Sequence, residues 1–361
     1  MEWRNILVRA PNWVGDLVMA TGSMADLRRS FPGARITVLL PPSRMAVLRG
    51  GAHFDALIPD PGKSLEAVWR LSRDLRARRF DLALVYPNSV RSALAPWMAR
   101  IPVRIGYGGG FRRLLLTRSL PEPGPRPPGP PEPPCRGAGP RRLPTPMASR
   151  YAALAAASGA RAGDGRPTLA VSAGCEERSE ARRRELGIPP GERLIGLNPG
   201  SSFGASKLWS AERFARLGDL LSERLGRRII LFVGPGEEAI GRRIASLLRS
   251  PAIDTGGAPL DLELLKPFVR DLDLLVTTDT GTRHYAVAFR VPVVVVMGPT
   301  HPGFTAAHLE ETEVVRKDVP CGPCHLKVCP TDHRCMTLIE PEEVLARSLA
   351  LLERTGRSAG P

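Results

Sequence analysis

Short, mostly apolar runs alternate along the chain with segments in which apolar residues recur at helical spacing. Near the start, residues 5–9 and 35–40 are such runs, and residues 17–31 between them carry apolar side chains every three or four positions. The first pattern is typical of strands buried on both faces of a sheet, and the second is typical of an amphipathic helix. The opening therefore predicts a strand, a helix that ends at Pro32 and Gly33, and a second strand.

The same alternation continues to the C-terminal part of the chain. Strands that alternate with helices form parallel sheets covered by helices, and such sheets bind ligands at the carboxyl ends of their strands. The fold class predicted is therefore α/β. The further predicted helices are 65–78, 151–158, 176–186, 211–225, 237–248 and 282–289, and the further predicted strands are 81–86, 194–197, 229–233, 274–277 and 293–297.

The length of 361 residues is too great for one ordinary core and predicts two domains. A Gly- and Pro-rich break at residues 187–191 sets the boundary, with one α/β domain over 1–188 and a second over 189–345, followed by a C-terminal helix and tail over 346–361. Residues 121–146 are so rich in Pro and Gly that we expect a disordered surface insertion there. Two successive α/β domains place the ligands in the cleft between them.

Composition narrows the class of protein further. Apolar residues make up 43% and charged residues 24%, as in soluble globular proteins, and no apolar stretch reaches the ~18 residues of a membrane span, so we expect a cytoplasmic protein. The net charge of +15 favours polyanionic partners, although a high-GC genome, which enriches its proteins in Arg, would produce the same excess of positive charge. Only 5% of the residues are aromatic, and no basic stripe with interleaved aromatics is present, so we expect no nucleic-acid partner.

The first candidate loop, residues 10–16, follows the first strand and ends at Asp16. One interpretation makes Asp16 the N-cap of the next helix. The other makes it a general base, because an inverting sugar transfer needs a carboxylate that takes the proton of the acceptor hydroxyl. Both roles would use the same carboxylate oxygens.

The second candidate loop, residues 198–209, also follows a strand and is rich in Gly and Ser. Ser201 and Ser202 could donate hydrogen bonds to phosphate oxygens, and Lys207 could neutralise a departing diphosphate. The alternative is an ordinary loop with a solvated lysine.

The third candidate loop, residues 277–284, follows an apolar strand and opens a helix. Asp279 could hold sugar hydroxyls, and His284 could face the phosphates; alternatively, Asp279 is a helix cap and His284 is half-buried and structural. Glu238 either accepts hydrogen bonds from the donor or only complements a helix dipole. The acidic pair Asp271 and Asp273 leads directly into a buried strand, which argues against a catalytic metal site.

Four cysteines form the sharpest local cluster of the chain. They are Cys321, Cys324, Cys329 and Cys335, with His325 and His333 between them. Four thiols in a cytoplasmic protein favour metal over disulfides, and this gives a structural zinc as one interpretation. Their spacing is looser than in paired zinc ribbons, so reduced cysteines in a loop beside the cleft remain the other. The sequence contains neither a P-loop motif nor a serine-hydrolase elbow.

Several motifs together resemble the lipopolysaccharide heptosyltransferase II group of glycosyltransferase family 9. The matching segments are residues 8–16, 87–94, 200–209, 278–281 with His284, 298–302 and the cysteine segment closing at 335–336. They occur in the order of the family between residue 6 and about residue 351, so the resemblance covers nearly the whole chain.

The resemblance implies a GT-B fold, in which two Rossmann-like parallel-sheet domains face a central cleft, with acceptor binding in the first domain and donor binding in the second. It implies inverting, metal-independent transfer from ADP-L-glycero-D-manno-heptose without a required cofactor. The residues that match the catalytic motif are Asp16 as the base and Lys207 at the diphosphate. Those that match the donor site are Gly200, Ser201, Ser202, Glu238, Asp279, Thr280, Gly281 and His284, and those that match the acceptor site are Asn12, Trp13, Asn88 and Ser89.

The implied acceptor is the phosphorylated inner core of lipid A, so we expect transient contact with the inner face of the cytoplasmic membrane, where a basic protein is attracted to anionic lipid. The Pro-rich segment over 121–146 interrupts the acceptor domain, where a modest loop is expected. Two other hypotheses stay open: another GT-B transferase with a different donor or acceptor, and a non-catalytic nucleic-acid-binding protein.

Overall fold

The computed structural model describes residues 2–62, 64–124 and 144–357. Most of the predicted insertion, residues 125–143, lies outside this range. The described chain forms two compact units, one made of residues 2–124 and 145–170 and the other of residues 144 and 171–357. Each unit is an α/β domain of its own.

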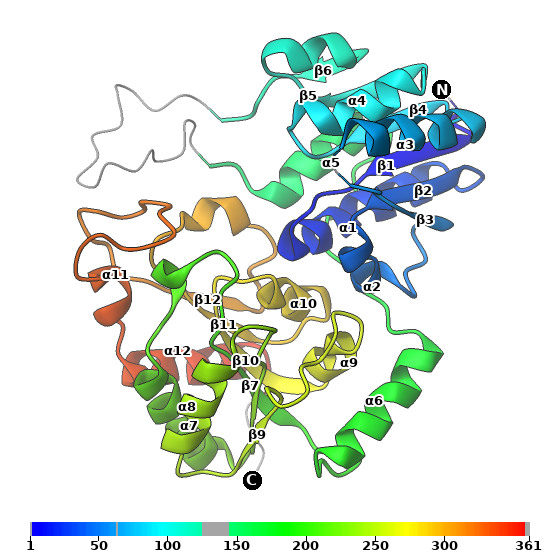
Figure 1. Ribbon diagram of the computed structural model, residues 1–361. Helices are drawn as coiled ribbons and strands as arrows, with labels where there is room; N and C mark the ends of the chain where they lie inside the picture. Colours follow the sequence, from blue (N-terminus) through cyan, green and yellow to red (C-terminus); the bar gives the residue numbers. More distant parts are fainter. Residues whose placement is uncertain (1, 63, 125–143, 358–361) are drawn as a thin grey trace. The chain divides into compact units, whose positions relative to one another are not determined.

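The first unit is built on six parallel strands in the order β3-β2-β1-β4-β5-β6 (Figure 1). Strand β1 lies in the middle and pairs with β2 and β4, so that Val8 is opposite Val38 on one side and Leu84 on the other. The strands are β1 (Asn5–Arg9), β2 (Arg35–Leu40), β3 (Ala56–Pro59), β4 (Leu82–Val85), β5 (Val103–Tyr107) and β6 (Arg118–Leu120).

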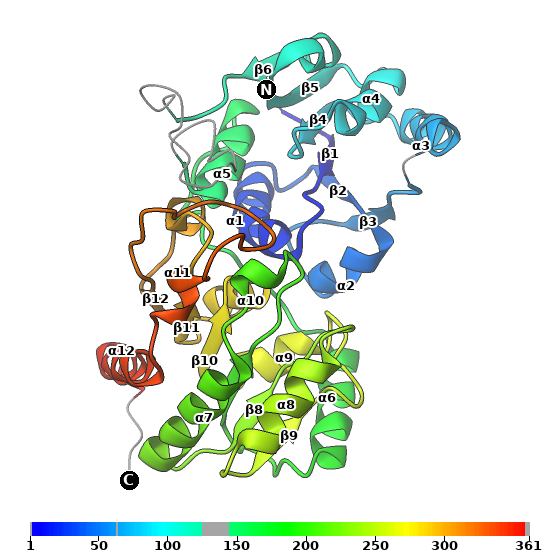
Figure 2. The ribbon, with the colours of Figure 1, turned by 60° about the vertical axis from the view of Figure 1, so that its left-hand side comes forward.

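The helices of the first unit form two packed groups. Helices α1 (Val14–Ser30) and α5 (Met147–Ala157) pack together, and α3 (Leu65–Ala77) packs with α4 (Val90–Met98) on the other side of the sheet (Figure 2). Shorter elements are η1 (Pro42–Arg44), α2 (Met45–Leu48) and η2 (Gly110–Leu115).

The second unit repeats the scheme with six parallel strands in the order β12-β11-β10-β7-β8-β9. They are β7 (Leu194–Asn198), β8 (Ile229–Leu231), β9 (Ala252–Asp254), β10 (Leu272–Thr278), β11 (Val293–Val296) and β12 (Thr312–Val315). Helix α7 (Ala211–Leu225) packs with α8 (Glu238–Leu247) and α12 (Pro341–Arg354), while α9 (Leu265–Arg270) packs with α6 (Ala173–Glu185) and α10 (Thr282–Ala288). The remaining elements are η3 (Ala205–Lys207), η4 (Pro302–Thr305) and α11 (Arg334–Thr337).

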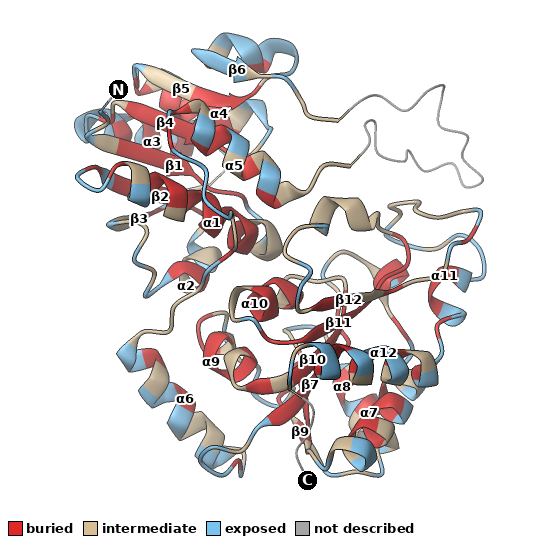
Figure 3. Ribbon diagram, turned by 180° about the vertical axis from the view of Figure 1, so that it is seen from behind, coloured by how far each residue is buried: buried red, intermediate tan, exposed pale blue. Residues whose placement is uncertain are grey.

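Burial explains why the sheets form where they do. The central strands of both units are buried along their length, and the helices expose only their outer faces (Figure 3). In the second unit, Trp209 is the largest fully buried side chain; its ring packs edge-on against Phe214, and its Nε1 donates to Ile339 O at 3.0 Å. This tryptophan anchors the chain directly after the loop that carries Lys207.

The predicted elements agree with the structure in kind, with shifts at their ends. Helix α1 begins at Val14, three residues before the predicted start, and its N-cap residue is Trp13. The interpretation of Asp16 as the N-cap is therefore wrong, because Asp16 lies within the first helical turn.

The ends of the second unit also differ from the predicted division of the chain. Helix α6 precedes the predicted boundary at residue 189 yet packs against α9 of the second unit. Helix α12 begins at Pro341, earlier than the predicted C-terminal helix over 346–361, and packs on α7 and on strands β11 and β12. Within residues 2–62, 64–124 and 144–357, no helix combines the length and the apolar character needed to cross a membrane.

Candidate active site

The carboxyl edge of the first sheet carries the predicted acceptor residues. Strands β1 and β4 are neighbours, and the segments that follow them hold Asn12 and Trp13 in one case and Asn88 and Ser89 in the other. The Trp13 side chain is exposed, Asn88 Nδ2 donates to Glu122 Oε1 at 3.0 Å, and Ser89 caps α4 with its side chain. The two segments identified from the sequence thus lie at the same edge of one sheet.

A buried ion pair holds the loop after β1. Arg9 Nη2 lies 2.6 Å from Asp60 Oδ2 and also donates to Asn12 Oδ1 at 3.3 Å. Arg44 Nε donates to the Asn12 carbonyl at 3.2 Å. Burial lowers the pKa of Arg9, and the Asp60 carboxylate opposes this shift. The backbone and the side chain of Asn12 are therefore both fixed by arginines.

Asp16 has a partner that the sequence did not indicate. The phenolic hydroxyl of Tyr151, on α5, donates a hydrogen bond to Asp16 Oδ1 at 3.0 Å. Tyr151 is only 3% exposed, and its ring stacks on that of Tyr86. The predicted base is thus held by a neutral donor from a helix that follows it by 135 positions.

In the second unit, the two predicted donor loops are joined by hydrogen bonds. They follow β7 and β10, which are neighbours in the sheet. Asn198 Nδ2 donates to Thr277 Oγ1 and to Thr280 Oγ1, both at 3.0 Å. Thr278 Oγ1 donates to the Gly200 carbonyl at 2.7 Å. Gly200 and Thr280, which were predicted to bind the donor, are therefore parts of one structured edge.

Lys207, which is buried, forms an ion pair with the partly buried Asp279 at this edge. Lys207 Nζ lies 2.6 Å from Asp279 Oδ2 and 2.8 Å from the Asp279 carbonyl. Thr300 Oγ1 donates to the same carboxylate at 2.7 Å, and Arg283 Nη1 lies 3.2 Å from its other oxygen. Burial alone would raise the pKa of Asp279, but the charges of Lys207 and Arg283 outweigh it and hold that pKa well below its usual range. Lys207 is therefore a buried, paired cation and not the solvated lysine of the alternative interpretation.

His284 is neutral in this surrounding. It is buried in the first turn of α10, where its backbone N–H donates to the backbone carbonyl of Gly281, the N-cap residue. Burial and the neighbouring Arg283 lower the pKa of His284 to about 3. At neutral pH its imidazole thus offers one donor and one acceptor but no charge.

The serines of the second loop differ in their environment. Ser201 Oγ is buried, and no partner for it is present among the described residues. The Ser202 side chain is exposed. A buried hydroxyl without a hydrogen bond is rare in native proteins, so Ser201 Oγ is free to bond to a water molecule or a ligand.

Of the two glutamates after β8, Glu237 and not the predicted Glu238 lies against Gly200. The carboxylate of Glu237 lies directly over Gly200, where a Cβ on that glycine would come within 1.9 Å of Glu237 Oε2. Glu237 also accepts from Gly234 N at 3.1 Å, whereas Glu238 Oε1 accepts from Gly236 N at 2.9 Å within its own turn. The glutamate that reaches the predicted donor loop is thus Glu237, one position before the predicted Glu238. The sequence gives no signal that separates two neighbouring Glu residues in one turn.

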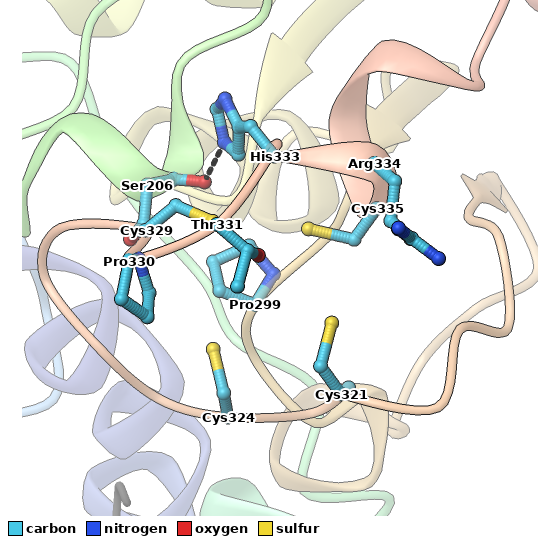
Figure 4. A pocket seen from close by; sticks show the side chains of 11 residues that line it. Ser206, Pro299, Cys321, Cys324, Cys329, Pro330, Thr331, His333, Arg334 and Cys335 are labelled. Atoms are coloured by element: carbon cyan, nitrogen blue, oxygen red, sulfur yellow. Dashed lines mark hydrogen bonds between the residues drawn. The ribbon is translucent and has the colours of Figure 1, made fainter. Parts of the chain in front are cut away.

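The four clustered cysteines line one small pocket, with the side chains of Cys321, Cys324 and Cys335 directed into it (Figure 4). Burial and the other three thiols raise the pKa of Cys335 to about 11. Across the described part of the chain, no group of three or more His, Cys, Asp or Glu side chains is arranged to hold a metal ion. The structure therefore gives the predicted zinc at Cys321, Cys324, Cys329 and Cys335 no support.

The cysteine segment instead braces the turn that carries Lys207. Ser206 N donates to the Lys327 carbonyl at 3.0 Å, and His333 Nε2 lies 2.6 Å from the Ser206 carbonyl (Figure 4). Gly204 has a φ of 154° and approaches so closely that a Cβ there would lie 2.4 Å from Lys327 O. Glycine is required at this position because no side chain fits between the two segments.

Comparisons with known proteins relate the chain to one protein family. The sequence profile of "Glycosyltransferase family 9 (heptosyltransferase)" matches residues 68–127 and 140–334. Lipopolysaccharide heptosyltransferase 2 of Escherichia coli K12 is 30% identical over 96% of this chain and 98% of its own length. The protein of the same name from Salmonella typhimurium is 29% identical over 97% of this chain and 99% of its own length.

A solved structure resembles the chain over its whole length. The structure of the E. coli ADP-heptose LPS heptosyltransferase II aligns with a TM-score of 0.77 and 27% identity, over 99% of this chain and 100% of that chain. Together with the two all-parallel sheets, this match confirms the predicted fold class, two Rossmann-like units of the GT-B type.

Proposed function

The chain belongs to glycosyltransferase family 9, the heptosyltransferases, and from this premise we propose that it transfers L-glycero-D-manno-heptose from ADP-heptose to the inner core of lipopolysaccharide. Support for the substrates comes from its relatives, which are named as lipopolysaccharide heptosyltransferases. Support for the chemistry comes from the residues at the two sheet edges.

The observation that carries the donor assignment is the buried Lys207 ammonium at the carboxyl edge of the second sheet. When the bond between the anomeric carbon and the diphosphate oxygen breaks, negative charge develops on that oxygen. A fixed cation at this point stabilises the transition state more than the ground state. The unpaired Ser201 hydroxyl can donate to the same diphosphate, and Glu237, beside Gly200, can accept from a donor hydroxyl.

The acceptor half of the reaction is assigned to Asp16. Its carboxylate takes the proton from the acceptor hydroxyl as that oxygen bonds to the anomeric carbon, and ADP leaves from the opposite face, which inverts the configuration. Asn12, Trp13, Asn88 and Ser89 are proposed to bind the acceptor. The site needs no metal in this scheme, because Lys207 supplies the positive charge.

Contact with the inner membrane face is a further part of the proposal. Leu65, Trp69, Val90, Phe111 and Leu114 are exposed large apolar side chains on α3, α4 and η2, and α4 contacts both of the other elements. Exposed arginines of α3 and η2 are Arg70, Arg73, Arg76 and Arg113. Apolar side chains among arginines suit an anionic lipid surface.

Sedimentation with vesicles tests this membrane contact. The unaltered protein should bind to anionic but not to zwitterionic lipid, and the double variant Phe111→Ser, Leu114→Ser should lose this binding. Equal binding by the unaltered protein and the double variant would contradict the proposed contact.

The first test is calorimetric titration with ADP, ADP-heptose, UDP-glucose and GDP-mannose in the presence of EDTA. We expect selective binding of ADP and ADP-heptose, followed by turnover with a lipid A core acceptor. Preference for another nucleotide would keep the glycosyltransferase and overturn its donor. Absence of all sugar-nucleotide binding, together with salt-sensitive binding to a DNA duplex, would instead favour the nucleic-acid-binding hypothesis.

A further inference from the structure

Tyr151 is the side chain of α5 that reaches the predicted base. Helix α5 packs along α1, and this places the Tyr151 hydroxyl 3.0 Å from Asp16 Oδ1 in the first turn of α1. Both residues belong to the first unit, so the contact depends only on the packing within that unit. The sequence motifs include Asp16 but not Tyr151.

The phenol ring of Tyr151 is fixed by its neighbour Tyr86. The two rings stack with centroids 5.1 Å apart and planes inclined by 21°. Tyr86 directs its own hydroxyl elsewhere, to Ser23 Oγ at 2.7 Å. The two buried tyrosines thus form one stack in which only Tyr151 is bonded to Asp16.

The protonation of the pair defines the direction of the hydrogen bond. Burial and the nearby Asp16 charge raise the pKa of Tyr151 well above its usual value, while Arg150 opposes this shift. Burial likewise raises the pKa of Tyr86, with Asp26 and Tyr107 acting in the same sense. The Tyr151 phenol is therefore protonated over the working pH range, and it donates while Asp16 accepts.

The hydroxyl of Tyr151 adds no charge beside the carboxylate that it contacts. An ammonium or guanidinium beside a carboxylate stabilises its charged form strongly and so weakens it as a base. The nearest arginine on α5, Arg150, has its Nη2 2.7 Å from Glu122 Oε2, and it lies over the ring of Tyr107. The hydroxyl of Tyr151 can orient the carboxylate of Asp16 while leaving its charge in place.

We propose that Tyr151 is a positioning residue for this glycosyltransferase, holding the Asp16 carboxylate in one orientation for proton transfer. The proposal rests on the function proposed above, because it presumes that Asp16 is the base. It adds a residue from α5, outside all motifs of the sequence, to the machinery of the first unit.

The test compares Tyr151→Phe with Tyr86→Phe. Each variant removes one buried hydroxyl from the same stack, but only the first removes the bond to Asp16. For Tyr151→Phe we expect a fall in kcat of about tenfold or more, with the donor KM changed less than about twofold, because a hydrogen bond to a charged group is lost. The acidic limb of its kcat profile should move to higher pH, since the charged form of the base loses a donor. Tyr86→Phe should keep both the rate and the profile of the unaltered protein.

A second readout does not depend on activity. In protein labelled with ¹³C-aspartate, the carboxyl signal of Asp16, identified by its absence in Asp16→Asn, should titrate at higher pH in Tyr151→Phe than in Tyr86→Phe. Equal titration and equal rates in the two variants would overturn the role of Tyr151. The function proposed above fails separately, if the unaltered protein does not transfer heptose or if Asp16→Asn transfers it normally.

Discussion

The carboxyl edges of the two sheets differ in the charges that surround their candidate residues. At the edge of the second sheet, the buried cations Lys207 and Arg283 both pair with the partly buried Asp279. At the edge of the first sheet, Asp16 is bonded to the neutral hydroxyl of Tyr151. A departing diphosphate needs a fixed positive charge, whereas a carboxylate that acts as a base needs a fixed orientation, which a hydroxyl donor can give it without adding charge.

The comparison also shows what each edge depends on for stability. A buried ion pair is sensitive to the loss of one partner, because the other is left as an unpaired charge away from water. A tyrosine bonded to a carboxylate loses only one hydrogen bond when its hydroxyl is removed. We therefore expect variants of the second edge to affect both folding and rate, and variants of the first edge to affect mainly the rate.

The largest effect is expected from Asp16→Asn. The amide cannot take the acceptor proton, so kcat should fall by about a thousandfold. Donor affinity, measured by calorimetry, should stay within about twofold, because the residues proposed to bind the donor belong to the other unit. An equal loss of donor affinity would mark Asp16 as a structural residue and remove the contrast between the two edges.

Lys207→Ala tests the charged edge. We expect kcat to fall by about a hundredfold, and the free energy of unfolding in urea to decrease by about 3 kcal/mol, because the partly buried Asp279 loses its closest partner. The double variant with Asp279→Asn should regain part of the stability but none of the activity. Recovery of activity in the double variant would show that Lys207 acts only as a structural partner.

Glu237→Gln and Glu238→Gln sharpen the comparison within the second edge. The Glu237 carboxylate lies over Gly200 in the loop after β7, while the Glu238 carboxylate accepts a hydrogen bond from the Gly236 amide in its own turn. We expect the first change to raise the donor KM by about tenfold and the second to leave it within about twofold. Steady-state kinetics with varied donor would decide, and the reverse order of effects would restore the residue named from the sequence.

The smallest effect is expected for the loss of folding stability that His284 causes as the pH falls. Its pKa is lowered to about 3 in the folded protein, from a usual value of 6.5. Above pH 6.5 both states are neutral; below it, the unfolded chain gains a proton that the folded protein does not, so stability falls. Between pH 7 and pH 5.5 the unaltered protein should lose about 1 kcal/mol more than His284→Gln, as measured by urea unfolding. Parallel losses would show that His284 titrates normally in the folded state.

Much of the fold was predictable because the central strands are buried on both faces and leave long apolar runs. Strands β1 and β2 and helix α7 have the predicted ends. Strands β3, β5, β6, β9 and β12 were missed, since they are short and most lie toward the edges of the sheets, where the apolar pattern is weak.

The site was predictable only where it is local in sequence. The loops that carry Asp16, Lys207 and Asp279 follow apolar strands, and that signal is visible in the sequence. The bond between Tyr151 and Asp16 spans 135 positions and depends on how α5 packs on α1, which no local pattern encodes. The pairing of Lys207 with Asp279, 72 positions apart, depends in the same way on strand order.

The rotation of α5 about its own axis sets two contacts at once, that of Arg150 with Glu122 and that of Tyr151 with Asp16. Arg150 and Tyr151 are consecutive residues about 100° apart around the helix; one reaches Glu122, which also bonds Asn88, and the other reaches Asp16. One residue inserted in α5 ahead of Arg150 would turn both side chains away from their partners at once. Changes of length in this part of the chain are therefore compatible with both contacts only where they leave the phase of α5 unaltered.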